Sequence, residues 1–145
     1  MPFAQGVPAV SATFTSWRAH DQDMIALKRV YDEAAETDGA RVLVDKLWPR
    51  GLASADADFE WEKAVAPTDM LRMWYGHQPE RYEAFAREYR AEMAEPERAA
   101  ALDRLTALAR SGTLTLLTAT KDPEHSQAAV LRDVLAERTQ QASTA

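Results

Sequence analysis

A short apolar string that gives way at once to charge constrains the fold of this chain more than any other feature. Val42, Leu43 and Val44 stand together with no polar residue between them, as in a strand buried on both faces of a parallel sheet. The residues that follow, 45–51, read Asp-Lys-Leu-Trp-Pro-Arg-Gly. Ligands of open α/β sheets bind at the carboxyl ends of the strands. Residues 45–51 therefore predict where the protein acts, although no motif in them names a reaction.

The strand pattern predicts a small parallel sheet. Strands are expected at 24–31, at 41–48 with Pro49 ending it, and at 113–120, with a fourth in the N-terminal tail or near 54–59. The connection between the second and third strands contains helices, which favours a parallel pair with a right-handed crossover. The sequence thus predicts a small single α/β domain, with a mainly parallel three- to four-stranded sheet flanked by helices in Rossmann-like layering.

Caps and apolar spacing predict the helices. They are expected at 56–65 with Asp56 or Asp58 as the N-cap, at 68–76 with Leu71 and Trp74 on one apolar face, at 79–93, at 96–112 and from 122 to about 138. Residues 1–22 show no periodicity and are expected to form a mobile tail, in which Phe14 and Trp17 could dock locally. The domain is expected to span 23–138, and residues 139–145 are expected to fray.

Composition excludes several classes of function. The 145 residues are 46% apolar and 28% charged, as in an ordinary soluble domain with one core, and no apolar run is long enough for a membrane helix. The N-terminus does not have the pattern of a secretory signal. Cysteine is absent, which excludes disulfides and thiol catalysis and agrees with a cytoplasmic location.

The net charge and the missing motifs narrow the partners further. The net charge is −6 and the basic residues form no long stripe, which argues against binding to nucleic acid. The Gly-rich dinucleotide motif, the P-loop and the Gly-x-Ser-x-Gly motif are all missing, which argues against dinucleotide enzymes, P-loop NTPases and α/β-hydrolases. The cofactor is unknown, and the oligomeric state stays open.

Charged residues follow two of the predicted strands. They are Asp45, Lys46 and Arg50 after the second strand, and Lys121, Asp122 and His125 after the third, at a predicted helix N-terminus. Parallel strands would bring both groups to one edge of the sheet. Helix N-termini favour anions, and an Arg side chain can grip a carboxylate or phosphate with two parallel hydrogen bonds. A small anionic ligand, such as a phosphorylated compound, is therefore predicted.

The candidate residues divide into two predicted roles. Asp45, His77 and His125 are candidates for acid or base catalysis, because carboxylates and loop histidines can exchange protons near neutral pH. Ligand binding is predicted for Lys28, Lys46, Trp48, Arg50, Lys121 and Asp122. No metal site is predicted, since the His and Asp residues lack the spacing of known metal motifs.

Structural roles compete with these assignments. Asp122 would cap the helix that follows it. A buried Asp45 must be paired or hydrogen-bonded, and an ion pair with Arg50, Lys28 or Arg29 would serve. His77 would equally cap the helix before it. Tryptophans 48, 61 and 74 belong more often to a core than to a ligand platform.

Several of these strings resemble a known family. The segments 28–31, 41–52, 66–67, 71–77 and 114–122 resemble the domain of unknown function 488 family, in its short YeaO-like branch, and the resemblance runs from about Ile25 to Leu135. Lys46 stands where that family usually has Arg, Tyr75 where it has Phe, and Ser126 where it often has Asn. The resemblance implies a compact α/β domain and a soluble bacterial-type protein. It marks Asp45, Arg50, His77, Lys121, Asp122 and His125, and it implies no activity.

Three functions are left open by the sequence. The first is a domain that binds or transforms a small anionic compound, held by Arg50 and Lys121. The second is a non-enzymatic regulatory module that contacts a protein or nucleic acid through Trp48 or Trp74 beside Arg50. The third is a structural network in which each named charge belongs to a buried pair.

Overall fold

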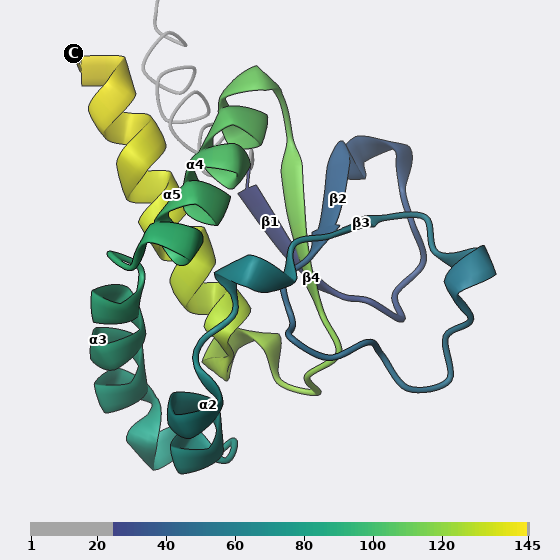
Figure 1. Ribbon diagram of the computed structural model, residues 1–145. Helices are drawn as coiled ribbons and strands as arrows, with labels where there is room; N and C mark the ends of the chain where they lie inside the picture. Colours follow the sequence, from purple (N-terminus) through teal and green to yellow (C-terminus); the bar gives the residue numbers. More distant parts are fainter. Residues whose placement is uncertain (1–24, 145) are drawn as a thin grey trace, which may run out of the picture.

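The computed structural model describes residues 25–144, with the side chains of 25–140, and shows a parallel sheet with α-helices against it (Figure 1). The strands are β1 (Ile25–Arg29), β2 (Ala40–Leu43), β3 (Glu60–Trp61) and β4 (Leu114–Thr118). The α-helices are α2 (Asp69–Tyr75), α3 (Tyr82–Glu92), α4 (Pro96–Ser111) and α5 (Gln127–Thr144). The tail predicted to be mobile, and the docking of Phe14 and Trp17, lie outside the described residues.

The sheet has the order β1-β4-β2-β3, and all its strands are parallel. Leu116 of β4 lies between Leu27 of β1 and Val42 of β2. The last strand in the chain is therefore central, and both neighbouring strands end at the same edge of the sheet. The predicted α/β class with a small parallel sheet is confirmed.

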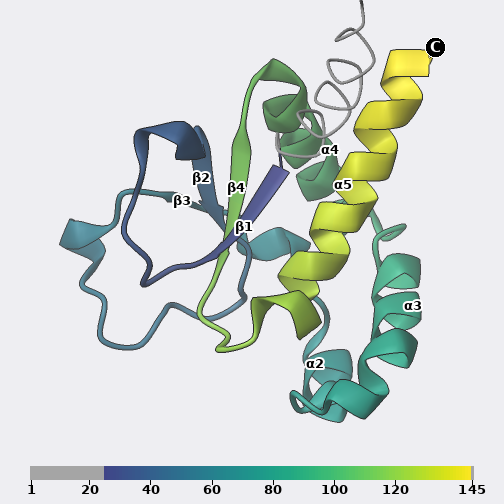
Figure 2. The same ribbon diagram turned by 180° about the vertical axis from the view of Figure 1, so that it is seen from behind.

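The two faces of the sheet are covered differently, as Figures 1 and 2 show. Leu114 and Leu116 face the large core, which α3, α4 and α5 complete with Phe85, Leu105 and Leu131. Alternate strand residues point to the opposite face. There Val30, Leu43 and Leu117 form a smaller cluster, covered by Trp48, Leu52 and Phe59 from the long connection between β2 and β3. That connection is folded against the sheet, so the segment after β2 is held in place.

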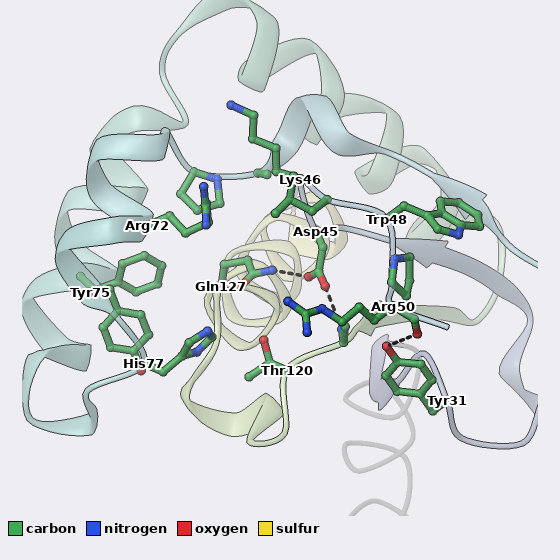
Figure 3. Close-up of a pocket in the computed structure, with 16 residues that line it drawn as sticks. Tyr31, Asp45, Lys46, Trp48, Arg50, Arg72, Tyr75, His77, Thr120 and Gln127 are labelled. Atoms are coloured by element: carbon green, nitrogen blue, oxygen red, sulfur yellow. Dashed lines mark hydrogen bonds between the residues drawn. The ribbon is translucent and has the colours of Figure 1, made fainter. Parts of the chain in front are cut away.

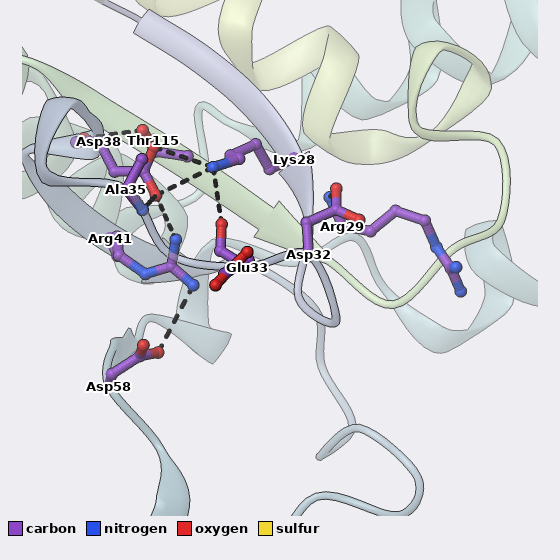
Figure 4. A network of polar contacts seen from close by, with 9 residues as sticks. All are labelled: Lys28, Arg29, Asp32, Glu33, Ala35, Asp38, Arg41, Asp58 and Thr115. Atoms are coloured by element: carbon purple, nitrogen blue, oxygen red, sulfur yellow. Dashed lines mark hydrogen bonds and ion pairs between the residues drawn. The ribbon is translucent and has the colours of Figure 1, made fainter.

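A polar network extends the second face toward the amino ends of the strands (Figure 4). Asp38 is buried and accepts hydrogen bonds from the Lys28 ammonium at 3.0 Å, from the backbone N–H of Ala35 at 3.0 Å and from Arg41. The Asp38 carbonyl also accepts a 2.7 Å bond from the Thr115 hydroxyl. Burial raises the pKa of Asp38, but these donors and charges outweigh it, so the pKa of Asp38 lies below its ordinary value.

The predicted helix at 56–65 is wrong. Residues Ser54–Asp56 and Lys63–Val65 form short 3-10 turns, and Glu60–Trp61 pairs with Val42–Leu43 as β3. This strand is a fourth strand of the sheet, as the sequence suggested, but it lies just after the expected 54–59, so that location is wrong. Pairing with β2 outweighed the capping signals of Asp56 and Asp58. It continues beyond β3, where Glu62 N–H donates to the Leu43 carbonyl at 2.9 Å.

Helix α2 has the predicted ends but a different inner face. The Thr68 hydroxyl accepts a hydrogen bond from Leu71 N–H, and Gly76 takes the left-handed conformation that ends the helix. Leu71 and Tyr75 are buried, whereas Trp74 is 44% exposed, with Arg81 over its ring. The expected pairing of Leu71 and Trp74 on one apolar face is therefore wrong, since the buried neighbour of Leu71 is four residues on.

Three further boundaries differ from the sequence prediction. Strand β2 ends at Leu43, so Asp45 and Pro49 lie in the following loop. Asp122 makes no capping hydrogen bond; a 3-10 turn intervenes, and the Ser126 hydroxyl accepts from Ala128 N–H instead. Helix α5 runs to Thr144, beyond the expected end near Arg138. Within the described residues, no helix combines the length and apolar character that crossing a membrane requires.

Candidate functional site

A pocket of about 400 Å³ opens at the carboxyl ends of β2 and β4, between the loop after β2 and helix α2 (Figure 3). It is lined by Tyr31, Asp45, Lys46, Leu47, Trp48, Pro49, Arg50, Ala66, Pro67, Arg72, Tyr75, His77, Phe85, Ala119, Thr120 and Gln127. The loop 45–50, which follows β2, thus forms one wall of the pocket. Five of the nine predicted site residues lie here: Asp45, Lys46, Trp48, Arg50 and His77.

The Asp45 carboxylate is held by three donors from β4 and α5. Its Oδ1 accepts from the Thr118 hydroxyl at 2.7 Å and from the Gln127 amide, and its Oδ2 accepts from Ala119 N–H at 2.8 Å. Its backbone carbonyl accepts from the Trp61 indole at 2.7 Å. Asp45 therefore ties the end of β2 to β4, α5 and β3.

The environment of Asp45 sets its charge. Burial raises the pKa of Asp45, and the hydrogen bonds from Ala119, Thr118 and Gln127, with the positive potential of His77, offset part of that rise. No ion pair with Asp45 is present among the described residues. Lys28 pairs with Asp38, and Arg29 donates to the carbonyls of Ala119 and Thr120, so the predicted ion pair with Arg50, Lys28 or Arg29 is not formed.

The pocket carries three cationic side chains, and they differ in their partners. Lys46 binds Asp69 at 2.8 Å, and Arg72 binds the same carboxylate at 3.3 Å. Figure 3 shows the Arg50 guanidinium reaching toward the centre of the pocket, near Asp45, Gln127 and Thr120. Within 25–140, no hydrogen bond or ion pair engages this guanidinium, while the Arg50 carbonyl accepts from the Tyr31 hydroxyl at 3.0 Å. Arg50 is therefore the cation most available to an anion.

His77 occupies the opposite side of the pocket in a strained backbone conformation. Its φ is 58°, and it is the one non-glycine residue with positive φ in the described chain. Such conformations cost energy and gather at functional sites, although His tolerates them better than most residues. The helix before it is closed by Gly76, whose N–H donates to the Arg72 carbonyl. The alternative role of His77 as a helix cap is thus taken by Gly76, and the His77 ring points into the pocket (Figure 3).

The other predicted site residues lie outside the pocket. Lys28 belongs to the Asp38 network on the second face of the sheet. Asp122 and His125 bind each other, with 2.8 Å between Oδ2 and Nδ1, and the His125 ring meets the edge of Tyr82. Lys121 is exposed beyond the end of β4. From the loop after β4, Ala119 and Thr120 line the pocket, and the charged residues that follow them do not.

Residues that sequence reasoning missed complete the pocket: Tyr31, Arg72, Tyr75, Thr120 and Gln127. Arg72 and Tyr75 stood within a string that was noted for its family resemblance, but neither was assigned to the site. Spacing alone could have suggested Arg72, because it lies on the helix turn before His77. No sequence signal marked Gln127, since only the packing of α5 brings it to Asp45.

The pocket lining contains several groups that can bind an anion. The pocket lining contains no serine, and its acidic side chain, Asp45, is occupied by three donors. Across the described residues, no cluster of three or more His, Asp and Glu side chains is placed to hold a metal ion. What the site offers is an available guanidinium, two further cations and several hydrogen-bonding groups around a carboxylate.

Comparison with known protein families identifies the chain as a member of the DUF488 family. Residues 24–145 match the family model described as "Inactive DUF488-N3 subclade", and the chain belongs to that family. Among its relatives, the uncharacterized protein Rv3073c of Mycobacterium tuberculosis (strain ATCC 25618 / H37Rv) is 42% identical over 112 residues, which cover 77% of this chain and 92% of the relative. The uncharacterized protein YeaO of Escherichia coli (strain K12) is 40% identical over 112 residues, covering 77% of this chain and 96% of YeaO. The predicted YeaO-like resemblance is confirmed. No solved structure gives a significant match.

Proposed function

We propose that the protein binds a small anionic molecule in the pocket at the carboxyl ends of β2 and β4, and that it does so without chemically transforming the ligand. The observation that carries the proposal is Arg50. Its guanidinium reaches into the pocket and has no protein partner among the described residues, whereas Lys46 and Arg72 share Asp69. A planar guanidinium matches a carboxylate or phosphate through two parallel hydrogen bonds.

Binding without turnover is favoured by two independent points. The matched family model is described as inactive. The carboxylate best placed to act as a base, Asp45, accepts three hydrogen bonds that tie strand ends together, so moving it toward a substrate would disturb the fold. Asp45 is thus proposed as a support for the pocket wall, and His77 as a neighbour that orients the ligand.

The test is titration of the full chain with inorganic phosphate and with sulfate, followed by isothermal calorimetry. Arg50→Ala should weaken phosphate binding about ten- to a hundredfold, which is the loss of a charge-assisted hydrogen-bond pair worth about 1.5–3 kcal/mol. Arg50→Lys should fall between, because it keeps the charge and loses the fork. Arg110→Ala, at the exposed end of α4, is the matched control and should leave binding unchanged.

Equal phosphate binding by the parent and Arg50→Ala would refute the proposal. The stability of Arg50→Ala should stay within about 0.5 kcal/mol of the parent, since the removed side chain is exposed and makes no described contact through its guanidinium. A loss of binding can then be attributed to the missing guanidinium and not to unfolding.

The other functions suggested by the sequence stay predictions. The regulatory module required an exposed tryptophan beside Arg50; Trp48 is there but half-buried against Phe59 and Trp61, and Trp74 is exposed on α2 outside the pocket. The structural network required a partner for each charge, and the side chains of Arg50 and Lys121 have none within the described part of the chain. The cytoplasmic location also stays a prediction.

A further inference from the structure

The centre of the pocket carries charges of both signs. The Asp45 carboxylate and the Arg50 guanidinium both lie against the same space in Figure 3. A bare anion held by Arg50 would approach an ionised Asp45, and like charges at close range repel. A ligand that fits must therefore present an anionic group to Arg50 and a hydrogen-bond donor to Asp45.

The bonding of Asp45 leaves room for one such donor. A carboxylate oxygen has two acceptor sites. Oδ1 uses both, for Thr118 and Gln127, whereas Oδ2 accepts only from Ala119 N–H among the described residues. The Gln127 side chain donates one amide N–H to Asp45, and its carbonyl oxygen is available as a second acceptor. Two neighbouring acceptors are what adjacent hydroxyl groups of a polyol require.

Thr120 adds a donor at the same place. Thr118 donates its one hydroxyl proton to Asp45 at 2.7 Å, so it has none for the Thr120 oxygen 3.2 Å away, and the Thr120 proton can turn toward a ligand oxygen. Figure 3 shows this hydroxyl pointing into the space between Gln127 and His77. Donor and acceptor groups in alternation suit hydroxyls, which both give and receive hydrogen bonds, better than they suit a hydrocarbon chain.

The size and net charge of the pocket narrow the choice. A volume of about 400 Å³ lies toward the lower end of the range of small-molecule pockets, about 300–1,000 Å³. Inorganic phosphate leaves most of this space empty, whereas a phosphorylated triose or pentose fills more of it. The three cations of the lining outnumber Asp45 and Asp69, the carboxylate that Lys46 and Arg72 share, which favours a phosphate over a zwitterion such as an amino acid.

Resting on the proposed anion binding, we infer that the ligand is a phosphorylated polyol or small sugar, whose phosphate binds Arg50 and whose hydroxyls bind Asp45 and Gln127. The phosphate lies at the Arg50 guanidinium, which reaches toward the centre of the pocket. Asp45 is then the residue that distinguishes a hydroxylated phosphate from an unsubstituted one.

The test compares ligands that differ only in hydroxyl groups, by calorimetry on the full chain. Glycerol 3-phosphate and propyl phosphate share one skeleton, and the former should bind at least about tenfold more tightly, as expected for hydrogen bonds to a charged acceptor. Ribose 5-phosphate should bind at least about tenfold more tightly than inorganic phosphate. Asp45→Asn should lose most of the difference between glycerol 3-phosphate and propyl phosphate.

The outcomes separate the two proposals. If propyl phosphate binds as tightly as glycerol 3-phosphate and inorganic phosphate still binds, the polyol inference is overturned and the anion pocket stands. If no phosphate compound binds, the proposed function fails and the inference falls with it. The ligand pair on the parent protein decides the question even if the Asp45 variant does not fold.

Discussion

Replacing Asp45 tests most directly how the strand ends are held together. Asp45→Ala removes the acceptor of three hydrogen bonds, from Thr118, Ala119 N–H and Gln127. The Thr118 hydroxyl and the Gln127 amide can turn to other partners, but Ala119 N–H is fixed by the backbone. Leaving that donor unsatisfied costs about 1–3 kcal/mol, and the two weaker losses add about 1 kcal/mol. The expected loss is about 3 kcal/mol.

Asp45→Asn should be much milder. The new side chain can place its oxygen against Ala119 N–H and direct its amide protons to the Thr118 oxygen and to the Gln127 carbonyl, once the Gln127 amide turns over. All three contacts then persist as neutral bonds, each weaker than a bond to a carboxylate. Relief of the buried charge offsets that weakening. The expected loss near pH 7 is within about 1 kcal/mol.

Urea unfolding followed by tryptophan fluorescence and circular dichroism measures both values, with unchanged m as the check on two-state behaviour. If Asp45→Asn costs as much as Asp45→Ala, the carboxylate charge itself is needed and the hydrogen-bond account is wrong. A loss of several kcal/mol in Asp45→Asn would instead indicate a broken ion pair, as expected if the named charges formed a structural network of buried pairs.

The pH dependence provides a second check on the same residue. Because burial raises the folded pKa of Asp45, the folded state binds a proton more tightly than the unfolded state, and between the two pKa values it holds a proton that the unfolded state has released. The favourable contribution of Asp45 is complete below the ordinary Asp pKa of about 3.9 and is lost as the pH rises through the higher folded value. The parent should therefore lose stability relative to Asp45→Asn with rising pH. The opposite slope would contradict the assigned environment.

Two further predictions concern the opposite edge of the sheet. Asp38→Asn should lower the free energy of unfolding by about 3–5 kcal/mol at pH 7, because Lys28 and Arg41 lose a buried partner. Since the pKa of Asp38 is lowered, its contribution to stability is present above pH about 4 and vanishes as the pH falls further. The difference in stability between the parent and Asp38→Asn should therefore close on acid titration, and a constant difference would contradict this. Gly39→Ala should cost more than about 3 kcal/mol or prevent folding, since φ is +64° and a Cβ would lie 2.2 Å from the Thr113 carbonyl oxygen. Gly51→Ala, with φ +76° and no atom within 4 Å of the Cβ, is its control and should cost about 1–2 kcal/mol in the same urea assay; equal losses would show that the contact with Thr113 is unimportant.

The sheet was predictable because its central strands carry their signal locally. Leu114–Thr118 and the string at 42–44 are apolar enough that only a sheet covered on both faces accommodates them. Strand β3 was not predictable in this way. It consists of Glu60 and Trp61, and both are exposed, so its strand character comes from pairing with Val42 and Leu43 and not from an apolar pattern. The acidic residues before it imitated a helix cap, and no local rule distinguishes the two cases.

The candidate site was half predictable for a related reason. Asp45, Arg50 and His77 lie at points where an element ends in a turn, and sequence marks such points with Pro, Gly and a change from apolar to charged residues. The same rule placed the site residues after β4 a few positions too far along the chain. The strand ends at Thr118, Ala119 and Thr120 already reach the pocket, and the chain has turned away at Asp122, where a 3-10 turn and the bond to His125 begin. Arg72 and Gln127 depend on how α2 and α5 are oriented, which only tertiary packing decides.

The position of Asp45 connects stability with the proposed function. A carboxylate that accepts from Thr118, Ala119 and Gln127 fixes the β4 loop and the start of α5 against the loop that carries Arg50. A pocket wall fixed in this way loses little entropy when a ligand binds, and preorganisation raises affinity. The same bonds keep Asp45 from moving without disturbing three elements. One set of hydrogen bonds thus supports the proposed binding, in a pocket where the Arg50 guanidinium has no partner among the described residues.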